Sequence, residues 1–220
     1  MRRAAALFLL CAACRGKPDV PILNYHSVGD KADEYTVTDA QFAQQLDWLS
    51  ANGIRTIGLH ELAKGRFVVL TFDDGKEDAL TRVLPALQKR GMKGAFFVIT
   101  GLIGTPGFLT WDGVRALDKA GMEIGSHTVT HARLADLPDE KVRDELVNSR
   151  QTLEAQLHKS VDLLAYPYNS VRSNVRAAAE AAGYRIAVSG VAHGGRDPLD
   201  LLRTSITGLT TFEQFKRVIR

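Results

Sequence analysis

The sequence predicts an α/β protein that folds as a single-domain (β/α) barrel, deformed or incomplete. Short runs rich in Val, Ile, Leu and Phe alternate with amphipathic helical segments along most of the chain. These runs are continuously apolar, which is typical of parallel strands buried on both faces. About eight strands are expected, the number in a closed barrel. A doubly wound open sheet shows the same alternation, so both architectures stay open.

The limits of the elements follow from caps and breakers. Thr38 and Gln41 form a capping-box pattern at the start of a helix that Gly53 ends, and Gly91 ends a later one. The expected strands are 20–25, 54–57, 67–72, 94–99, 122–124, 161–165, 184–188 and 202–206. Helices are expected after Thr38, around Glu61, over 77–90, 111–120, 139–158 and 173–182, and from Thr211 onward.

Composition narrows the possible functions. The 220 residues are 45% hydrophobic and 24% charged, which excludes a disordered chain and a polytopic membrane protein. The net charge is +3, but Arg2 and Arg3 belong to an N-terminal leader, so no nucleic-acid partner is expected. Both cysteines, Cys11 and Cys14, lie in or next to that leader, which excludes disulfides, Cys-based zinc sites and thiol nucleophiles from the domain.

The leader has the form of an export signal. Residues 1–13 combine a basic start with an apolar run too short to span a bilayer as a helix. The segment Leu10-Cys11-Ala12-Ala13-Cys14 resembles the lipobox of bacterial lipoproteins, so lipidation of Cys14 is expected, with plain secretion as the alternative. Residues 14–19 are then a linker and 20–220 the domain. We expect a lipid-anchored protein of the bacterial cell envelope, otherwise a periplasmic or secreted one.

Two acids end one predicted strand. Asp73, Asp74 and Gly75 follow the apolar run 67–72 directly. Adjacent carboxylates at a strand end repel each other and lose hydration, so a compensating charge such as a metal ion is needed. The alternative is that one Asp caps the next helix while Gly75 turns the chain.

Two histidines follow another predicted strand. His127 comes after the run 122–124, and His131 lies four residues further on. Two imidazoles at this spacing converge on one cation if the residues between them form a turn, although a lone His127 would more simply be a structural residue. Strand ends of a barrel meet at one mouth. One Asp with these two His would be a catalytic rather than a structural ligand set.

Three segments resemble, in order and spacing, motifs of the polysaccharide deacetylases, the NodB-homology proteins of carbohydrate esterase family 4. They are Thr71–Gly75, Ser126–His131 and Ala165–Tyr168, and the similarity extends from Pro21 to the C-terminal helix. The resemblance implies a deformed (β/α) barrel of the NodB-homology type. It also implies a divalent metal, usually Zn²⁺, and hydrolysis of N-acetyl or O-acetyl groups on sugars.

The same resemblance implies roles for individual residues. Asp74, His127 and His131 correspond to metal ligands, and Asp73 to the general base. The backbone around Tyr168 corresponds to the part that stabilises the oxyanion. These roles agree with general chemistry, because a bound Zn²⁺ lowers the pKa of water to about 7 and a neighbouring carboxylate then takes its proton.

The sequence departs from the family at the position of the catalytic acid, the group that protonates the leaving amine. Many members carry a His near the C-terminus, but the stretch 202–207 has none. The first and last strands of a barrel are neighbours, so His26, after the first strand, is the expected acid. This resembles the permuted motif order of poly-N-acetylglucosamine deacetylases. His193, in the Gly-rich loop 190–195, is the rival.

The third motif departs as well. Many relatives have an Arg that braces the base where this chain has Ala165, and a Gly where it has Asn169. Asn tolerates a left-handed backbone, which favours survival of the loop. The brace for Asp73 is left unassigned, with Arg203 as a guess. Trp111 is expected in the core or at its rim, and His60 and His158 at the surface.

These observations predict a metal-dependent hydrolase that removes N-acetyl groups from a polysaccharide containing N-acetylglucosamine. The alternatives are an O-acetyl esterase of the xylan type and an inactive glycan-binding lipoprotein of the same fold. The expected partner is an acetylated polysaccharide, with no nucleic acid and no membrane contact except through the lipid. The protein is expected to be a monomer.

Overall fold

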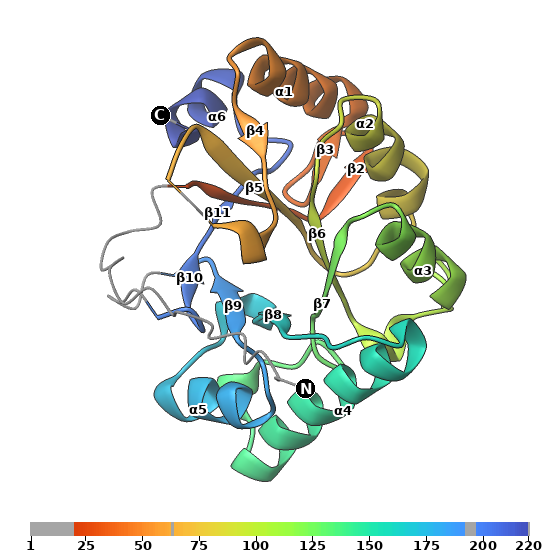
Figure 1. Cartoon of the computed structure of the whole chain (residues 1–220), viewed down its shortest axis with the longest axis vertical. Coiled ribbons are helices and arrows are strands. Elements are labelled where there is room, and N and C mark those ends of the chain that lie inside the picture. Colours follow the sequence, from red (N-terminus) through yellow and green to blue (C-terminus); the bar gives the residue numbers. More distant parts are fainter. Residues whose placement is uncertain (1–19, 63, 192–196, 220) are drawn as a thin grey trace, which may run out of the picture.

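A parallel β-sheet curved almost into a closed barrel forms the centre of the protein (Figure 1). The computed structural model describes residues 20–62, 64–191 and 197–219. Every ladder between the sheet's strands is parallel. Because the sheet curves round until its two ends nearly meet, the expected (β/α) barrel is confirmed over the open doubly wound sheet. Around the ring the main strands are β9 (Ile186–Ser189), β8 (Leu163–Ala165), β7 (Glu123–Ser126), β6 (Ala95–Val98), β5 (Phe67–Phe72) and β1 (Ile22–Tyr25).

The ring closes through one interrupted segment near the C-terminus. There β10 (Leu201–Leu202) pairs with β9, and β11 (Thr204–Ser205) pairs with β1. Arg203 lies between the two halves, and its backbone N–H donates to the carbonyl of Ser189 (2.8 Å). The single strand expected over 202–206 is therefore wrong, because the segment changes partners at Arg203.

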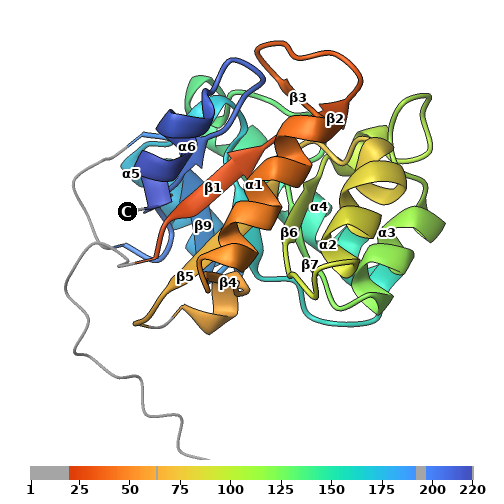
Figure 2. The same ribbon diagram turned by 90° about the horizontal axis from the view of Figure 1, so that it is seen from above.

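Helices cover the outside of the barrel (Figures 1 and 2). The capping box of Thr38 and Gln41 is confirmed at the start of α1. The helix expected over 77–90 is instead a π-helical turn, Ala79–Val83, followed by a short α2, because Pro85 has no N–H to continue a regular ladder. The helices are α1 (Asp39–Ala51), α2 (Leu84–Gln88), α3 (Trp111–Lys119), α4 (Asp139–Leu157), α5 (Ser173–Ala181) and α6 (Phe212–Ile219).

The strand period of two sorts side chains into an outer and an inner layer. On β5, Leu70 and Phe72 pack outward in the large core under the helices, while Val69 lies in the cluster that fills the barrel. Thr71 and then Asp73 continue the inner row toward the carboxyl end of the strand. The interior is tight: a Cβ on Gly125 would lie 2.6 Å from the Phe97 ring.

Smaller elements complete the fold. A parallel pair that the sequence did not predict, β2 (Ser27–Gly29) and β3 (Thr36–Thr38), frames a turn at the carboxyl end of β1. The short strand β4 (Arg55–Thr56) pairs with β5. Trp111 is partly buried against the large core, as expected. No helix in the described part of the chain is long and apolar enough to cross a membrane.

Candidate functional site

Asp73, at the end of β5, is buried and held by an arginine from the other side of the barrel seam. Arg203 Nη1 and Nη2 donate to the two carboxylate oxygens at 2.7 and 2.5 Å, and both side chains are only 2% exposed. Burial opposes ionisation of Asp73, but the charges of Arg203 and His127 and the hydrogen bonds from Arg203 outweigh it and hold its pKa at about 2. Asp73 is therefore a carboxylate at neutral pH.

Asp74, the next residue, lies beside the two histidines of the second motif. Its backbone is left-handed (φ 71°), a costly conformation for a residue with a Cβ. Its Oδ1 is buried without a hydrogen-bond partner among the described residues, and it lies 3.6 Å from Nε2 of both His127 and His131. The alternative that an Asp here caps the next helix is not supported, because the cap of that turn is Asp78.

The two histidines present their Nε2 atoms to Asp74. The Nδ1–H of His127 donates to the carbonyl of Ala165 (2.8 Å), which leaves Nε2 as the atom with a free lone pair. Burial lowers the pKa of His127. Burial and the nearby charge of His127 lower the pKa of His131 to about 4. Both rings are therefore neutral at pH 7, the form that binds metal ions.

A tight turn brings His131 back beside His127. Thr128 and His131 are both left-handed (φ 68° and 61°), and the Thr128 hydroxyl accepts from the His131 N–H (3.1 Å). Glu145 on α4 fixes the turn, because its carboxylate accepts from the N–H groups of Val129 and Thr130 (2.8 and 2.9 Å). Sequence reasoning missed Glu145, which no motif marks.

These residues fit a divalent metal ion. One ligand atom from each of Asp74, His127 and His131 lies within 4.8 Å of the others, and no other group of this kind occurs in residues 20–62, 64–191 and 197–219. The unpartnered Asp74 Oδ1 and the His127 Nε2 lone pair converge on one point. An Asp and two His with room for further ligands is a donor set that suits Zn²⁺.

His26 lies at the same mouth. The N–H of Asp73 donates to the carbonyl of Tyr25 (2.9 Å), so the next residue, His26, follows β1 beside the end of β5. The charge of His26 also contributes to lowering the pKa of Asp73 and of His131. The structure thus brings the expected acid to the Asp and His cluster. The rival His193 and the lipidation candidate Cys14 lie outside the described residues.

The third-motif loop borders the ligands. Tyr168 and Asn169 are both left-handed (φ 55° each), so the expectation that Asn169 preserves this backbone is confirmed. The Asn169 side-chain oxygen accepts from the N–H of Gly190 (2.6 Å), which ties the loop to the end of β9. The Tyr168 ring centroid lies 4.6 Å from that of His131. Arg203, named from the sequence only as a guess for the brace, binds both oxygens of Asp73.

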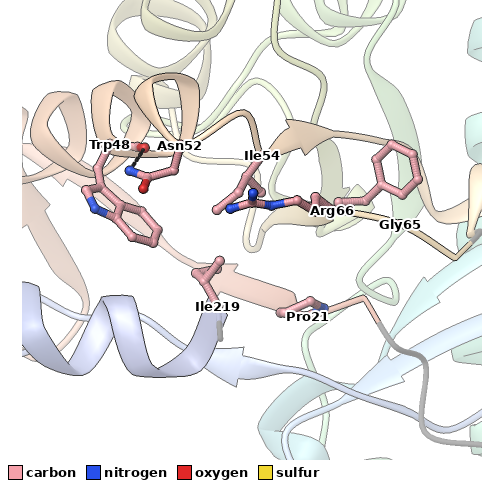
Figure 3. A pocket seen from close by; sticks show the side chains of 8 residues that line it. Pro21, Trp48, Asn52, Ile54, Gly65, Arg66 and Ile219 are labelled. Atoms are coloured by element: carbon pink, nitrogen blue, oxygen red, sulfur yellow. Dashed lines mark hydrogen bonds between the residues drawn. The ribbon is translucent and has the colours of Figure 1, made fainter.

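A hollow at the other end of the strands holds none of these groups (Figure 3). Pro21 and Phe67, which line it, stand at the beginnings of β1 and β5. Trp48 and Ile219 add apolar surface to its wall, and Arg66 adds a charged group. The polar cluster is therefore confined to the mouth at the carboxyl ends of the strands, where barrel enzymes carry their active sites.

Comparison with known proteins agrees with this geometry. The family model for polysaccharide deacetylase matches residues 61–187. YxkH of Bacillus subtilis (strain 168) is 29% identical over 179 residues, and the poly-beta-1,6-N-acetyl-D-glucosamine N-deacetylase of Staphylococcus aureus (strain MSSA476) is 25% identical over 187. These alignments cover 77% and 75% of this chain. The chain spans 64% of the length of either relative.

A solved structure shares the architecture. The Streptococcus pyogenes deacetylase PplD, in complex with acetate, superposes with a TM-score of 0.83 at 26% identity. The match covers 91% of this chain and 98% of PplD. Family model, relatives and architecture agree with one another and with the three motifs at the barrel mouth. The chain belongs to the polysaccharide deacetylase family.

Proposed function

We propose that this protein is a metal-dependent hydrolase that removes N-acetyl groups from a polysaccharide containing N-acetylglucosamine. The observation that carries the proposal is the convergence of Asp74, His127 and His131 next to an ionised, buried Asp73. A site that only bound sugar would have no use for a second carboxylate beside the metal ligand. The name of the Staphylococcus aureus relative supports an N-acetylglucosamine polymer as substrate.

Asp74, His127 and His131 would hold the metal, with Zn²⁺ as the expected ion. A metal ion bound there would lower the pKa of a water molecule and polarise the acetyl carbonyl. Asp73 accepts the proton of the attacking water, and Arg203 keeps the carboxylate ionised and oriented for that task. Backbone N–H groups of the loop around Tyr168 stabilise the charge on the carbonyl oxygen.

His26 completes the reaction as the acid. The amide C–N bond breaks as His26 donates a proton to the leaving nitrogen, so the products are acetate and a free amine on the sugar. An amine leaves poorly without a proton, whereas an ester oxygen depends on one less. The acid therefore separates the proposed reaction from the hydrolysis of O-acetyl groups.

The base is tested by replacing Asp73. Asp73→Asn keeps the shape of the side chain but removes its basicity, so acetate release from N-acetylglucosamine oligomers should fall about 1,000-fold. Asp112→Asn is the control, because this carboxylate is 92% exposed on α3. Undiminished release by Asp73→Asn would overturn the assignment. Acetate from acetylated xylan alone would identify an O-acetyl esterase, and binding without release a glycan-binding protein.

The acid is tested by comparing two leaving groups. His26→Ala should lose most of its activity on the N-acetyl substrate and keep most of its activity on an aryl acetate ester, which needs less protonation of the leaving group. An equal loss on both substrates would show that His26 acts in some other way. The lipid on Cys14 and the location in the cell envelope stay predictions, tested by mass spectrometry of the mature N-terminus.

A further inference from the structure

Two tyrosines stand exposed at the mouth of the barrel, each in contact with a histidine of the site. Tyr35 is 57% exposed and Tyr168 is 53% exposed. The Tyr35 ring lies 5.6 Å from the His26 ring, edge to face, and the Tyr168 ring lies 4.6 Å from the His131 ring. Single exposed aromatic residues are ordinary, but two that flank one cluster of reactive groups call for a ligand.

The two tyrosines stand on different loops at the mouth. Tyr35 comes from the turn between β2 and β3, and Tyr168 from the loop after β8. Opposite sides of the opening therefore each supply one ring.

The turn that carries Tyr35 is fixed by backbone contacts. The Asp33 carboxylate accepts from the N–H groups of Tyr35 and Thr36 (2.8 and 2.6 Å), and Ser27 N–H donates to the Tyr35 carbonyl (3.1 Å). Gly208 N–H donates to the carbonyl of Asp33 (3.0 Å). A Cβ on Gly208 would lie 2.3 Å from the Thr36 carbonyl oxygen, so the two segments pack closely. The fold thus holds Tyr35 in solvent rather than leaving it on a loose loop.

The two rings differ in their surroundings. Tyr168 packs against His131 and lies under the guanidinium of Arg133, 4.2 Å from the ring centroid. His26 is the one aromatic neighbour of Tyr35 among the described residues, and Tyr35 is the more exposed of the two tyrosines. Tyr35 therefore has aromatic surface left for a ligand next to the proposed acid. Tyr168 is already engaged in holding the ligand loop.

We propose that Tyr35 is a specificity-determining residue that stacks against the pyranose ring bound at the site, next to His26. This inference rests on the proposed function, since the ring in question is that of the N-acetylglucosamine unit or its neighbour. Such a pyranose carries its substituents equatorially and offers an apolar face of C–H groups, which suits an aromatic ring. The contact gives affinity for the sugar and takes no part in acetyl hydrolysis itself.

Sugar binding without turnover is the direct test. The probe is a tetramer of β-1,6-linked N-acetylglucosamine, titrated calorimetrically into the Asp73→Asn protein, in which hydrolysis does not deplete it. Adding Tyr35→Ala should raise the Kd about 3- to 10-fold, the range expected for one aromatic contact. Tyr35→Phe should keep the Kd within about twofold of the parent, because stacking needs the ring and not the hydroxyl. Leu202→Ala is the matched control, since Leu202 is also exposed but lies on β10.

An unchanged Kd in Tyr35→Ala, or no binding of the tetramer by the Asp73→Asn parent, would overturn the inference. A second readout separates stacking from an effect through His26. With Asp73 intact, Tyr35→Ala should leave hydrolysis of 4-nitrophenyl acetate, which has no sugar, within about twofold of wild type, and an equal loss on ester and tetramer would contradict stacking. A different result would contradict the proposed function but not the stacking: the wild-type protein would release no acetate from the tetramer, while the Kd would still depend on Tyr35.

Discussion

Replacing Arg203 by Met removes the charge that holds Asp73 while keeping a side chain of similar length. The pKa of Asp73 is about 2, against an ordinary value of 3.8, although the carboxyl is completely buried. That difference is a net stabilisation of the carboxylate of about 2 kcal/mol, to which Arg203 is the largest favourable contributor. Without the charge and hydrogen bonds of Arg203, less offsets the effect of burial, so the pKa of Asp73 rises.

Stability and activity should both respond. Removing one partner of a buried pair leaves the other uncompensated, so Arg203→Met should lower the free energy of unfolding at pH 7 by about 3 kcal/mol. Because the folded-state pKa of Asp73 is lowered, the ionised carboxylate stabilises the wild-type fold above pH 3.8, and this stabilisation is lost as the pH falls toward 2. In Arg203→Met the folded-state pKa of Asp73 moves up from about 2, so the loss of stability between pH 3.8 and pH 2 should shrink or reverse. The kcat should fall about 100-fold, since the base is no longer oriented.

Urea unfolding and acetate release measure these effects, and a double variant separates them from general damage. Asp73→Asn with Arg203→Met leaves no buried unpaired charge, so it should be more stable than the sum of the single losses predicts, by about 2 kcal/mol. Arg203→Lys should recover part of the stability, because it restores the charge but not the two-pronged hydrogen bond. Additive losses, or Arg203→Met with wild-type kcat and an unshifted acid limb of the pH profile, would refute the reasoning.

Two further predictions concern stability. Asn169→Val should lower the free energy of unfolding by about 2 kcal/mol, because a β-branched residue is strained at φ 55°. Asn169→Gly loses only the hydrogen bond to Gly190 and should lower it by about 1 kcal/mol. Equal melting temperatures for the two variants would contradict this. Hydrogen bonds to Asp162 and then Glu123 raise the pKa of His60 to about 10. The stabilisation of the fold by the protonated His60 is therefore complete below pH 6.5 and is lost as the pH rises toward 10. The side chain is 46% exposed, so His60→Gln should cost only about 1 kcal/mol at pH 6 and less at pH 10, and equal costs in urea unfolding would contradict the prediction.

The fold was predictable where local signals are strong. Continuous apolar runs identified the buried strands, and the capping box of Thr38 identified the start of α1. The seam was not predictable, because nothing local to Arg203 shows that the strand changes partners there. The pair β2 and β3 is three residues long on each side, too short for a periodic pattern.

The site divides in the same way. Asp74, His127 and His131 stand at strand ends, and barrel topology brings strand ends together, so their meeting could be predicted. Arg203 reaches Asp73 from 130 residues away, and the only hint in the sequence that another residue must brace the base was Ala165 at the position where relatives have an Arg. Glu145 carries no motif, since a Glu in a long amphipathic helix is ordinarily a surface residue. Contacts over such separations follow from the closed barrel rather than from spacing.

The central claim is that Asp74, His127 and His131 hold a divalent metal that the chemistry requires. The direct test is metal content by mass spectrometry, with acetate release from the same samples. Purified protein loaded with Zn²⁺ should retain about one equivalent per chain, as a three-ligand catalytic site does. His127→Ala should retain almost none and release no acetate, while His158→Ala, on an exposed His at the end of α4, should match the wild type. Full metal content or full activity in His127→Ala would contradict the account.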